Sequence, residues 1–109
     1  MTLTKVTLAE VASGQWRLTG ELTFATCADS WSPLLACLQG NAVKLDVAGL
    51  IRVDSAGLAT LVAWLAEARR RQISVELLGA NEQLLQLARV GGVDTVLPLH
   101  WQADVAVNG

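Results

Sequence analysis

The residues of this chain that could do chemistry are few, and their spacing does not match that of common catalytic or metal sites. Asp46 and Asp54 flank the stretch VAGLIRV and could hold a metal ion or act as an acid–base pair, but no histidine or third acid joins them in the sequence. Ser55 has Gly57 after it but lacks the earlier glycine of a nucleophile elbow. The only histidine, His100, has no identifiable partner. We therefore expect no enzyme activity, no metal and no cofactor.

Composition and charge limit the class of protein further. The net charge of −2 gives no electrostatic reason to expect a nucleic-acid partner. Cys27 and Cys37 have no further cysteine or histidine nearby, so their spacing favours neither a disulfide framework nor a zinc site. The amino terminus lacks the apolar core of a signal peptide, and the longest nearly uncharged run, residues 56–66, is shorter than the roughly 20 residues of a membrane span. We expect a soluble cytoplasmic protein.

The pair Asp54-Ser55 lies where a strand or loop gives way to a helical pattern. Either residue could cap the helix that follows. A phosphate on Ser55 would lie at a helix N-terminus, where free amides and the helix dipole favour anions. The adjacent Asp54 carboxylate would repel that phosphate, so a phosphorylation switch at Ser55 is permitted by the physics and not required by it.

A flank of the same helix has the character of a docking surface. Gly57 is a poor helix former that costs up to about 1 kcal/mol relative to alanine, and it would allow another backbone to approach. Thr60 and Trp64 continue along this flank, beside the leucine stripe. Trp64 could instead pack under the neighbouring helix, which leaves two alternatives open. The predicted partner-binding residues are Asp54, Ser55, Ala56, Gly57, Thr60 and Trp64.

Hydrophobic periodicity predicts alternating strands and helices. Strands are expected at residues 3–8, 15–21, 42–50, 73–78 and 95–99, the first two forming a hairpin and the last an edge. Helices are expected at 56–71 and within 24–38, where Pro33 should delay the start to Trp31 or Ser32 or kink the helix. A third helix is expected after an Asn81 cap and should end at Gly91-Gly92. Such an order favours an α/β fold in which a small mixed sheet carries its helices on one face. We assign residues 1–99 to a single domain and 100–109 to a C-terminal tail.

The stretch LDVAGLIRVDSAGLATLV, residues 45–62, carries a family resemblance. A strand ending in aspartate, a short loop and then Asp-Ser-x-Gly-Leu opening a helix resemble the STAS domain, the fold of anti-sigma factor antagonists. The likeness covers about residues 3–99 and includes the order of elements. In those antagonists, the serine matching Ser55 is phosphorylated by an anti-sigma factor kinase, which releases the antagonist.

A second branch of the family is similar to MlaB, a cytoplasmic STAS subunit bound to the ATPase of a phospholipid ABC transporter. There a hydroxyl residue of the same motif lies at the contact with the ATPase. The short chain, the leucine-rich helix and the ending GANEQLLQLARVGGVDTVLPL look closer to this branch. The resemblance implies a non-catalytic subunit that binds and regulates an ABC transporter ATPase, peripheral to the inner membrane through that partner, and supports outer-membrane lipid asymmetry. The alternative it implies is an anti-sigma factor antagonist switched by phosphorylation of Ser55.

Overall fold

The computed structural model describes residues 5–93 and the backbone of residues 99–101. The described elements, in chain order, are β1 (Val6–Ala12), β2 (Gln15–Leu22), α1 (Cys27–Ala36), β3 (Ala42–Asp46), β4 (Leu50–Val53), α2 (Ser55–Arg70), β5 (Ser74–Ala80), α3 (Glu82–Val90) and β6 (Leu99–Trp101). None of the helices in the described part of the chain has the length and apolar character needed to cross a membrane.

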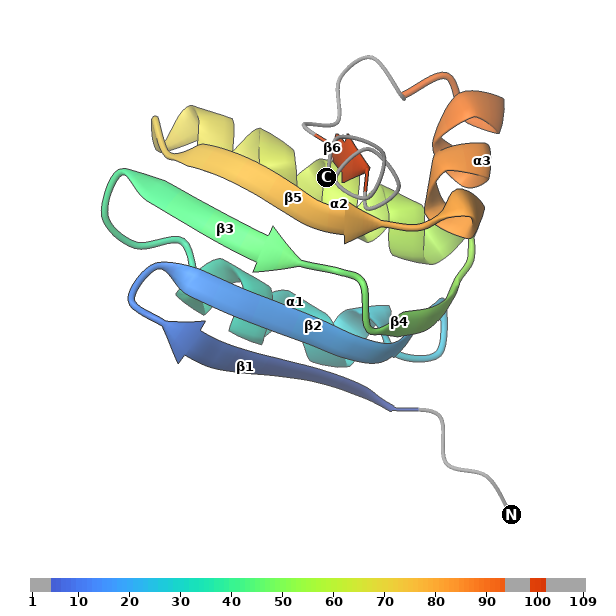
Figure 1. Cartoon of the computed structure of the whole chain (residues 1–109), viewed down its shortest axis with the longest axis horizontal. Coiled ribbons are helices and arrows are strands. Elements are labelled where there is room, and N and C mark those ends of the chain that lie inside the picture. Colours follow the sequence, from blue (N-terminus) through green and yellow to red (C-terminus); the bar gives the residue numbers. More distant parts are fainter. Residues whose placement is uncertain (1–4, 94–98, 102–109) are drawn as a thin grey trace, which may run out of the picture.

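The described strands form one mixed sheet in the order β1-β2-β3-β5-β6, as Figure 1 shows. β1 and β2 are antiparallel and form the predicted hairpin. The other pairings are parallel. β2 is long enough to pair with two strands in succession: residues 15–17 pair with β3, and residues 20–22 pair with β4. The carboxyl end of β2 therefore lies beside the short strand that leads into α2.

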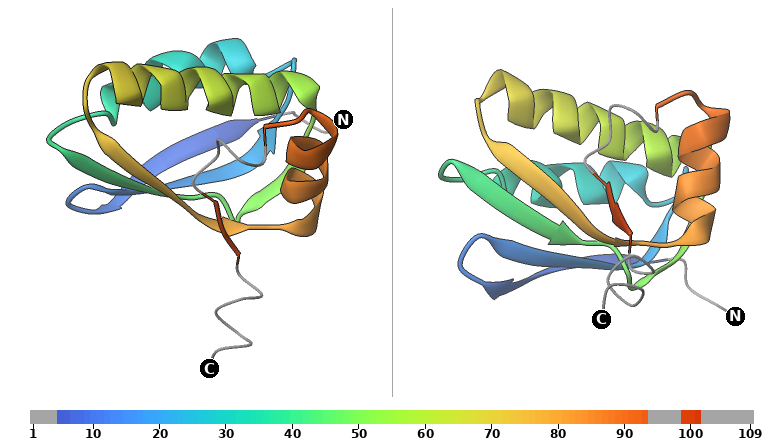
Figure 2. Two further views of the ribbon diagram at one scale, coloured as in Figure 1. Left: turned by 90° about the horizontal axis from the view of Figure 1, so that it is seen from above. Right: turned by 45° about the horizontal axis from the view of Figure 1, so that its top comes forward.

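The helices lie on one face of this sheet, which confirms the predicted fold class (Figure 2). α1 and α2 pack side by side, and α3 contacts both α2 and β4. Asn81 is the N-cap of α3, as predicted, because its side chain accepts a hydrogen bond from the Leu84 amide at 2.9 Å. In Figure 1, α3 lies at the same end of the molecule as the start of α2.

The hydrophobic core fills the space between the helices and the sheet. Its fully buried side chains include Leu18 and Leu22 of β2, Leu34 of α1, Leu45 of β3, Leu61 of α2 and Leu77 of β5. Trp64 of α2 is the largest of the fully buried side chains. Its indole N–H donates to the backbone carbonyl of Leu34 at 2.7 Å, which satisfies the polar atom that a buried tryptophan carries into a core.

The start of α1 differs from the prediction. The helix begins at Cys27 and continues through Pro33, whereas the sequence pattern placed its start near Trp31 or Ser32. Proline removes one amide donor from the helix. Ser30 and Leu34, on either side of it, are buried in the fold. Tertiary packing of this face therefore outweighs the local cost of proline.

The segment predicted as one strand over residues 42–50 is divided in two. β3 ends at Asp46, whose carboxylate accepts a hydrogen bond from the Ala48 amide at 2.8 Å within a tight turn. The Leu50 amide then bonds to the Val47 carbonyl at 3.1 Å, and β4 begins. The turn shifts the chain from its pairing with β5 to a position beside the end of β2.

The carboxyl-terminal boundary also differs in part. Residues 94–98, which hold most of the predicted edge strand, lie outside the described residues. β6 begins at Leu99 and pairs with β5 at the edge of the sheet, so its backbone includes the first two residues of the predicted tail. The remainder of the tail, residues 102–109, lies outside the described residues.

Candidate functional site

The start of α2 is fixed by Asp54, which is the N-cap of the helix. One carboxylate oxygen accepts the Gly57 amide N–H at 2.9 Å, and the other accepts the Phe24 amide N–H at 3.0 Å. The Gly57 hydrogen bond, followed by the Phe24 hydrogen bond, lowers the pKa of the Asp54 carboxyl below its usual value. A single ionised side chain thus ties α2 to the loop between β2 and α1.

Ser55 is the first residue of α2, and its side chain is exposed. Because Asp54 supplies the cap, the serine hydroxyl is not needed to satisfy the helix end. Within the described part of the chain, that hydroxyl has no hydrogen-bond partner. Asp54 is therefore the cap, and the Ser55 hydroxyl is accessible to another molecule.

Gly57 does permit a close approach, but the approaching group belongs to this chain. The residue is buried, and a Cβ atom built on it would collide with the backbone carbonyl of Leu22 at the end of β2. The Asp54 amide also donates to that carbonyl, at 3.4 Å. The prediction that Gly57 lets a partner's backbone approach is therefore wrong, since β2 already occupies the space.

Thr60 and Trp64 differ in exposure, although the sequence placed both on one flank of the helix. Trp64 is 0% exposed and donates a hydrogen bond to Leu34 of α1. Of the two alternatives for this side chain, exposed or packed under the neighbouring helix, the structure shows the second. The predicted contact of Trp64 with a partner is therefore wrong. The physical reason is that α1 covers the flank of α2 on which Trp64 lies. Thr60 is partly exposed, as Ala56 is, and its hydroxyl donates to the Ala56 carbonyl at 2.9 Å.

Two apolar grooves run along the outer side of α2. The groove between α1 and α2, of about 600 Å³, is lined by Cys27, Ala28, Trp31, Ala56, Ala59, Thr60 and Ala63. The groove between α2 and α3, of about 480 Å³, is lined by Ser55, Leu58, Ala59, Val62, Ala63, Ala66, Leu87, Val90, Gly91 and Val93. We call the exposed residues between them, Ser55, Ala59, Ala63 and Ala66, the α2 ridge. Their steps of four, four and three residues are the signal in the sequence that could have revealed this face.

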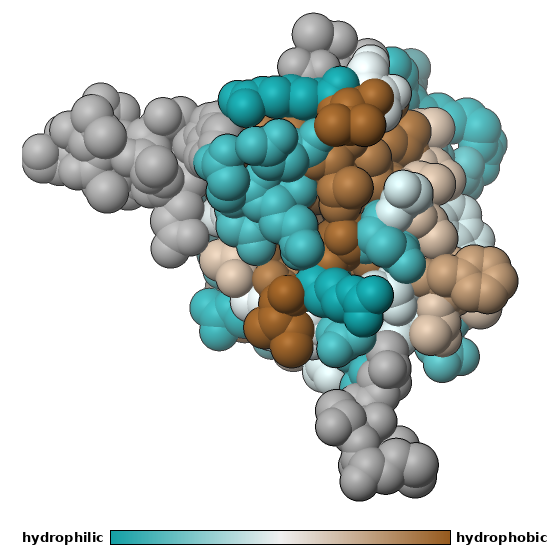
Figure 3. Space-filling model, turned by 90° about the vertical axis from the view of Figure 1, so that its right-hand side faces the viewer, coloured by the Kyte–Doolittle hydropathy of each residue, from teal (hydrophilic) through white to brown (hydrophobic). Residues whose placement is uncertain are grey.

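Three large apolar side chains are exposed, on the loop before α1, on α3 and on β4. Phe24 is 80% exposed on the loop before α1, and Val90 is 86% exposed at the end of α3. Ile51 on β4 is 76% exposed. Figure 3 shows apolar side chains gathered among hydrophilic ones on the side of the molecule where α3 lies. Phe24 precedes α1, which begins at Cys27, so it lies outside the helix although it falls within the range 24–38 in which the sequence pattern placed a helix.

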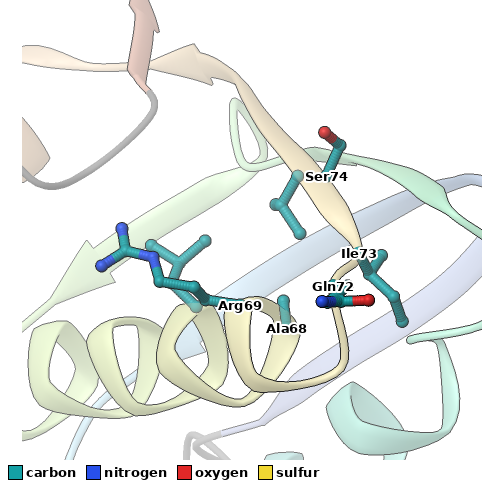
Figure 4. A pocket seen from close by; sticks show the side chains of 7 residues that line it. Ala68, Arg69, Gln72, Ile73 and Ser74 are labelled. Atoms are coloured by element: carbon teal, nitrogen blue, oxygen red, sulfur yellow. The ribbon is translucent and has the colours of Figure 1, made fainter.

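The other candidates among the described residues make contacts within the chain. Asp46 forms an ion pair with Arg17 at 3.6 Å in addition to its hydrogen bond within the turn. No group of three or more histidine, cysteine, aspartate or glutamate side chains among the described residues could hold a metal ion. Burial raises the pKa of the Cys37 thiol to about 11. A small cavity of about 300 Å³ lies at the other end of α2, beside Ala68, Arg69, Gln72, Ile73 and Ser74 (Figure 4).

The comparisons with known proteins agree with this architecture. A family model described as "Mlab, STAS domain" matches residues 8–99. An anti-sigma factor antagonist from Mycobacterium paratuberculosis is similar over 98% of this chain and 95% of its own, with a TM-score of 0.77 and 18% identity. The anti-sigma factor antagonist SpoIIAA in its unphosphorylated form is similar over 94% of this chain and 93% of its own, with a TM-score of 0.67 and 12% identity.

The structure of SLC26A9 contains a similar region. The match covers 81% of this chain but 17% of that one, with a TM-score of 0.62 and 19% identity. No curated protein matches the chain. At these low identities, the similarity to the solved structures shows only that the fold is shared. The family model matches most of the sequence and so shows the family. The chain therefore belongs to the STAS domain family.

Proposed function

We propose that this chain is a non-catalytic STAS subunit that binds and regulates the ATPase of a phospholipid-transporting ABC complex. STAS domains generally act by binding other proteins, and the matching family model carries the description "Mlab". In this role the chain lies in the cytoplasm, peripheral to the inner membrane through its partner. The complex would maintain the lipid asymmetry of an outer membrane.

The observation that carries the proposal is the surface around Ser55. The hydroxyl is exposed and is not used for capping, and the other three residues of the α2 ridge are alanines. Small side chains let a partner's backbone come close to the helix, and the apolar grooves on both sides supply area whose burial favours association. Asp54, Ser55, Ala56 and Thr60 are the members of the predicted site that fit this role.

Binding alone can regulate the ATPase, with no catalytic group supplied by this subunit. A partner that binds one conformation of the ATPase more tightly than another shifts the population toward the first by that difference in affinity. The STAS chain would therefore change the ATPase rate while contributing no catalytic group to it.

The test is co-purification with the ATPase subunit, followed by measurement of ATP hydrolysis. Ser55→Arg and Ala59→Arg place a long charged side chain on the α2 ridge and should abolish both the complex and the change in rate. Ala9→Arg is the matched control: Ala9 is exposed on β1, while its neighbour Leu8 packs against the core, so Ala9 points away from the helices. Complex formation that survives both ridge variants would contradict the proposal.

The second candidate is an anti-sigma factor antagonist controlled by phosphorylation of Ser55. It is favoured by the exposed hydroxyl at a helix N-terminus and by the similarity to SpoIIAA, whose structure is known in both unphosphorylated and phosphorylated forms. On this reading, an anti-sigma factor kinase with ATP should add one phosphate to the wild type and none to Ser55→Ala. Intact mass spectrometry that finds no addition to the wild type would exclude this role.

A further inference from the structure

A polar cavity lies at the opposite end of the molecule from Ser55. The β1–β2 turn, the end of α1 and the loop that leads into β3 meet there, as Figure 1 shows. The cavity has a volume of about 390 Å³, which is within the range of small-ligand sites. Its walls include the polar side chains of Glu10, Ser13, Gln39 and Asn41 beside the ring of Trp16.

Glu10 and Trp16 line this cavity from neighbouring strands. The two residues are direct partners in the antiparallel pairing of β1 with β2, so their side chains lie on the same face of the sheet. That face carries the helices, since Trp16 packs against the hydrophobic core. Within the described part of the chain, the Glu10 carboxylate has no hydrogen bond and no ion pair. A carboxylate without a counter-charge therefore lies beside an aromatic ring, and both groups attract a cation.

The end of α1 adds negative potential to the same cavity. A helix has a partial negative charge at its carboxyl terminus. The last turn of α1 has no basic residue that would offset this charge, and the C-cap residue Cys37 lines the cavity. The side-chain amide of Gln39 donates through Nε2 to the Ala36 carbonyl at 2.9 Å, which leaves its Oε1 as an acceptor. The helix end thus favours a positively charged hydrogen-bond donor.

The described residues supply no cation of their own to this cavity, because no lysine or arginine among them lines it. The basic residues nearest to the lining in the sequence, Arg17 and Lys44, belong to the opposite face of the sheet. Arg17 follows the inward-facing Trp16 and forms an ion pair with Asp46 at 3.6 Å. Lys44 is exposed and precedes the buried Leu45. A cation in the cavity must therefore come from another molecule.

We infer that this cavity binds a primary alkylammonium group, such as a lysine side chain or a free small amine carries. The ammonium group has three N–H donors, and the side-chain oxygens of Glu10, Gln39 and Asn41 supply acceptors on the walls. The alkyl chain that carries the ammonium group packs against the Trp16 ring. The site is separate from the surface around Ser55, so the inference does not depend on the proposed function.

Two-dimensional ¹H–¹⁵N NMR of the full chain without a partner tests the site. Added n-butylammonium chloride should shift the indole signal of Trp16 and the amide signals of Gly14 and Gly40, which also line the cavity, with a dissociation constant on the order of millimolar. The affinity should fall as the ionic strength rises. The matched control ligand is 1-butanol, which has the same alkyl chain without the charge and should shift these signals far less. Equal shifts with 1-butanol, or no shift up to about 50 mM n-butylammonium, would overturn the inference.

A second ligand distinguishes the two sources of the ammonium group. The Nα-acetyl methylamide of lysine carries the same charged chain on a peptide backbone. If it binds as tightly as n-butylammonium, the site accepts a lysine side chain of another protein. If n-butylammonium binds and the blocked lysine does not, the site accepts a free amine. Either result supports the inference that the cavity recognises an alkylammonium group.

Variants of the two lining residues test their roles. Glu10→Gln should raise the dissociation constant of n-butylammonium about fivefold, as expected for loss of an exposed ion pair. Asp29→Asn is the matched control, because it removes the same charge from an exposed position in the first turn of α1, and it should leave the affinity unchanged. Trp16→Leu should raise the dissociation constant about tenfold, and Trp16→Phe, which keeps an aromatic ring, should raise it less.

Thermal unfolding separates loss of the site from loss of the fold. Glu10 is exposed, so Glu10→Gln should unfold at the same temperature as the wild type, and weaker binding in this variant then reports on the cavity. An unchanged dissociation constant in Glu10→Gln would overturn the inference. An equal loss of affinity in Asp29→Asn would also overturn it, since the ligand would then respond only to the net charge of the chain.

Discussion

The substitution Trp64→Phe gives the sharpest test of how α2 packs. It removes the indole N–H that donates to the Leu34 carbonyl at 2.7 Å inside the core. A buried acceptor that loses its partner costs about 1–3 kcal/mol. The Cys37 thiol still donates to the same carbonyl at 3.0 Å, which keeps the loss near the lower end of that range. The smaller ring also leaves a void worth about 1 kcal/mol, so the free energy of unfolding should fall by about 2–3 kcal/mol.

The assay is urea unfolding followed by far-ultraviolet circular dichroism. With a denaturant dependence of about 1.5 kcal/mol per molar urea, the midpoint should fall by about 1.5 M. Trp64→Ala should cost about 3–5 kcal/mol and lower the midpoint further. Trp31→Phe is the control, because Trp31 is only partly buried and lines the groove between α1 and α2.

The opposite pattern would refute the packing. If Trp64→Phe left the unfolding midpoint unchanged while abolishing binding to the ATPase, the indole would face the partner, as the flank in the sequence first suggested. A small effect of Trp31→Phe on unfolding, beside a large effect of Trp64→Phe, would support the structure.

Three further predictions concern the start of α2 and the two thiols. Gly57→Ala should lower the free energy of unfolding by about 1–2 kcal/mol in thermal or urea unfolding, because the collision with the Leu22 carbonyl outweighs a gain in helix propensity of up to about 1 kcal/mol. Asp54→Ala should cost about 1 kcal/mol at neutral pH through loss of the cap. Because the pKa of Asp54 is lowered in the folded state, the stabilisation by its charge is complete above the unfolded pKa of about 4 and is lost as the pH falls below that value. In urea unfolding, the free energies of the wild type and Asp54→Ala should therefore differ at pH 7 and become similar at pH 3. A difference that stays constant between the two pH values would contradict this prediction. In the native protein at pH 8, N-ethylmaleimide should modify Cys27 at least about a hundredfold faster than Cys37, whose pKa is raised to about 11, and equal rates by peptide mapping would contradict its burial.

Several features of the fold could be predicted because they depend on neighbours along the chain. The apolar stripe of α2 repeats at helical spacing, and Asn81 lies directly before the helix that it caps. The β1–β2 hairpin turns at Ser13-Gly14, where Gly14 has a positive φ of 72°. These interactions join residues a few positions apart, so composition and spacing are enough to predict them.

The docking surface could be predicted only in part. The sequence indicated Ser55 and Thr60, because both follow from the start and the period of one helix. It did not indicate that the Phe24 side chain is exposed, because that exposure depends on how the loop between β2 and α1 lies in the folded chain. Nor could it decide between Asp54 and Ser55 as the cap, because both residue types favour that position.

Most of the local elements and the Asp-Ser-x-Gly-Leu motif of the STAS family can be recognised from the order of the amino acids alone. The folded structure was needed to show that Trp64 is buried, that the end of β2 packs against Gly57, and that the Phe24 amide bonds to Asp54. The bonds from Trp64 to Leu34 and from Phe24 to Asp54 each join residues 30 positions apart. Such contacts depend on where α1 and β2 come to lie after folding, and no local period in the sequence encodes that placement.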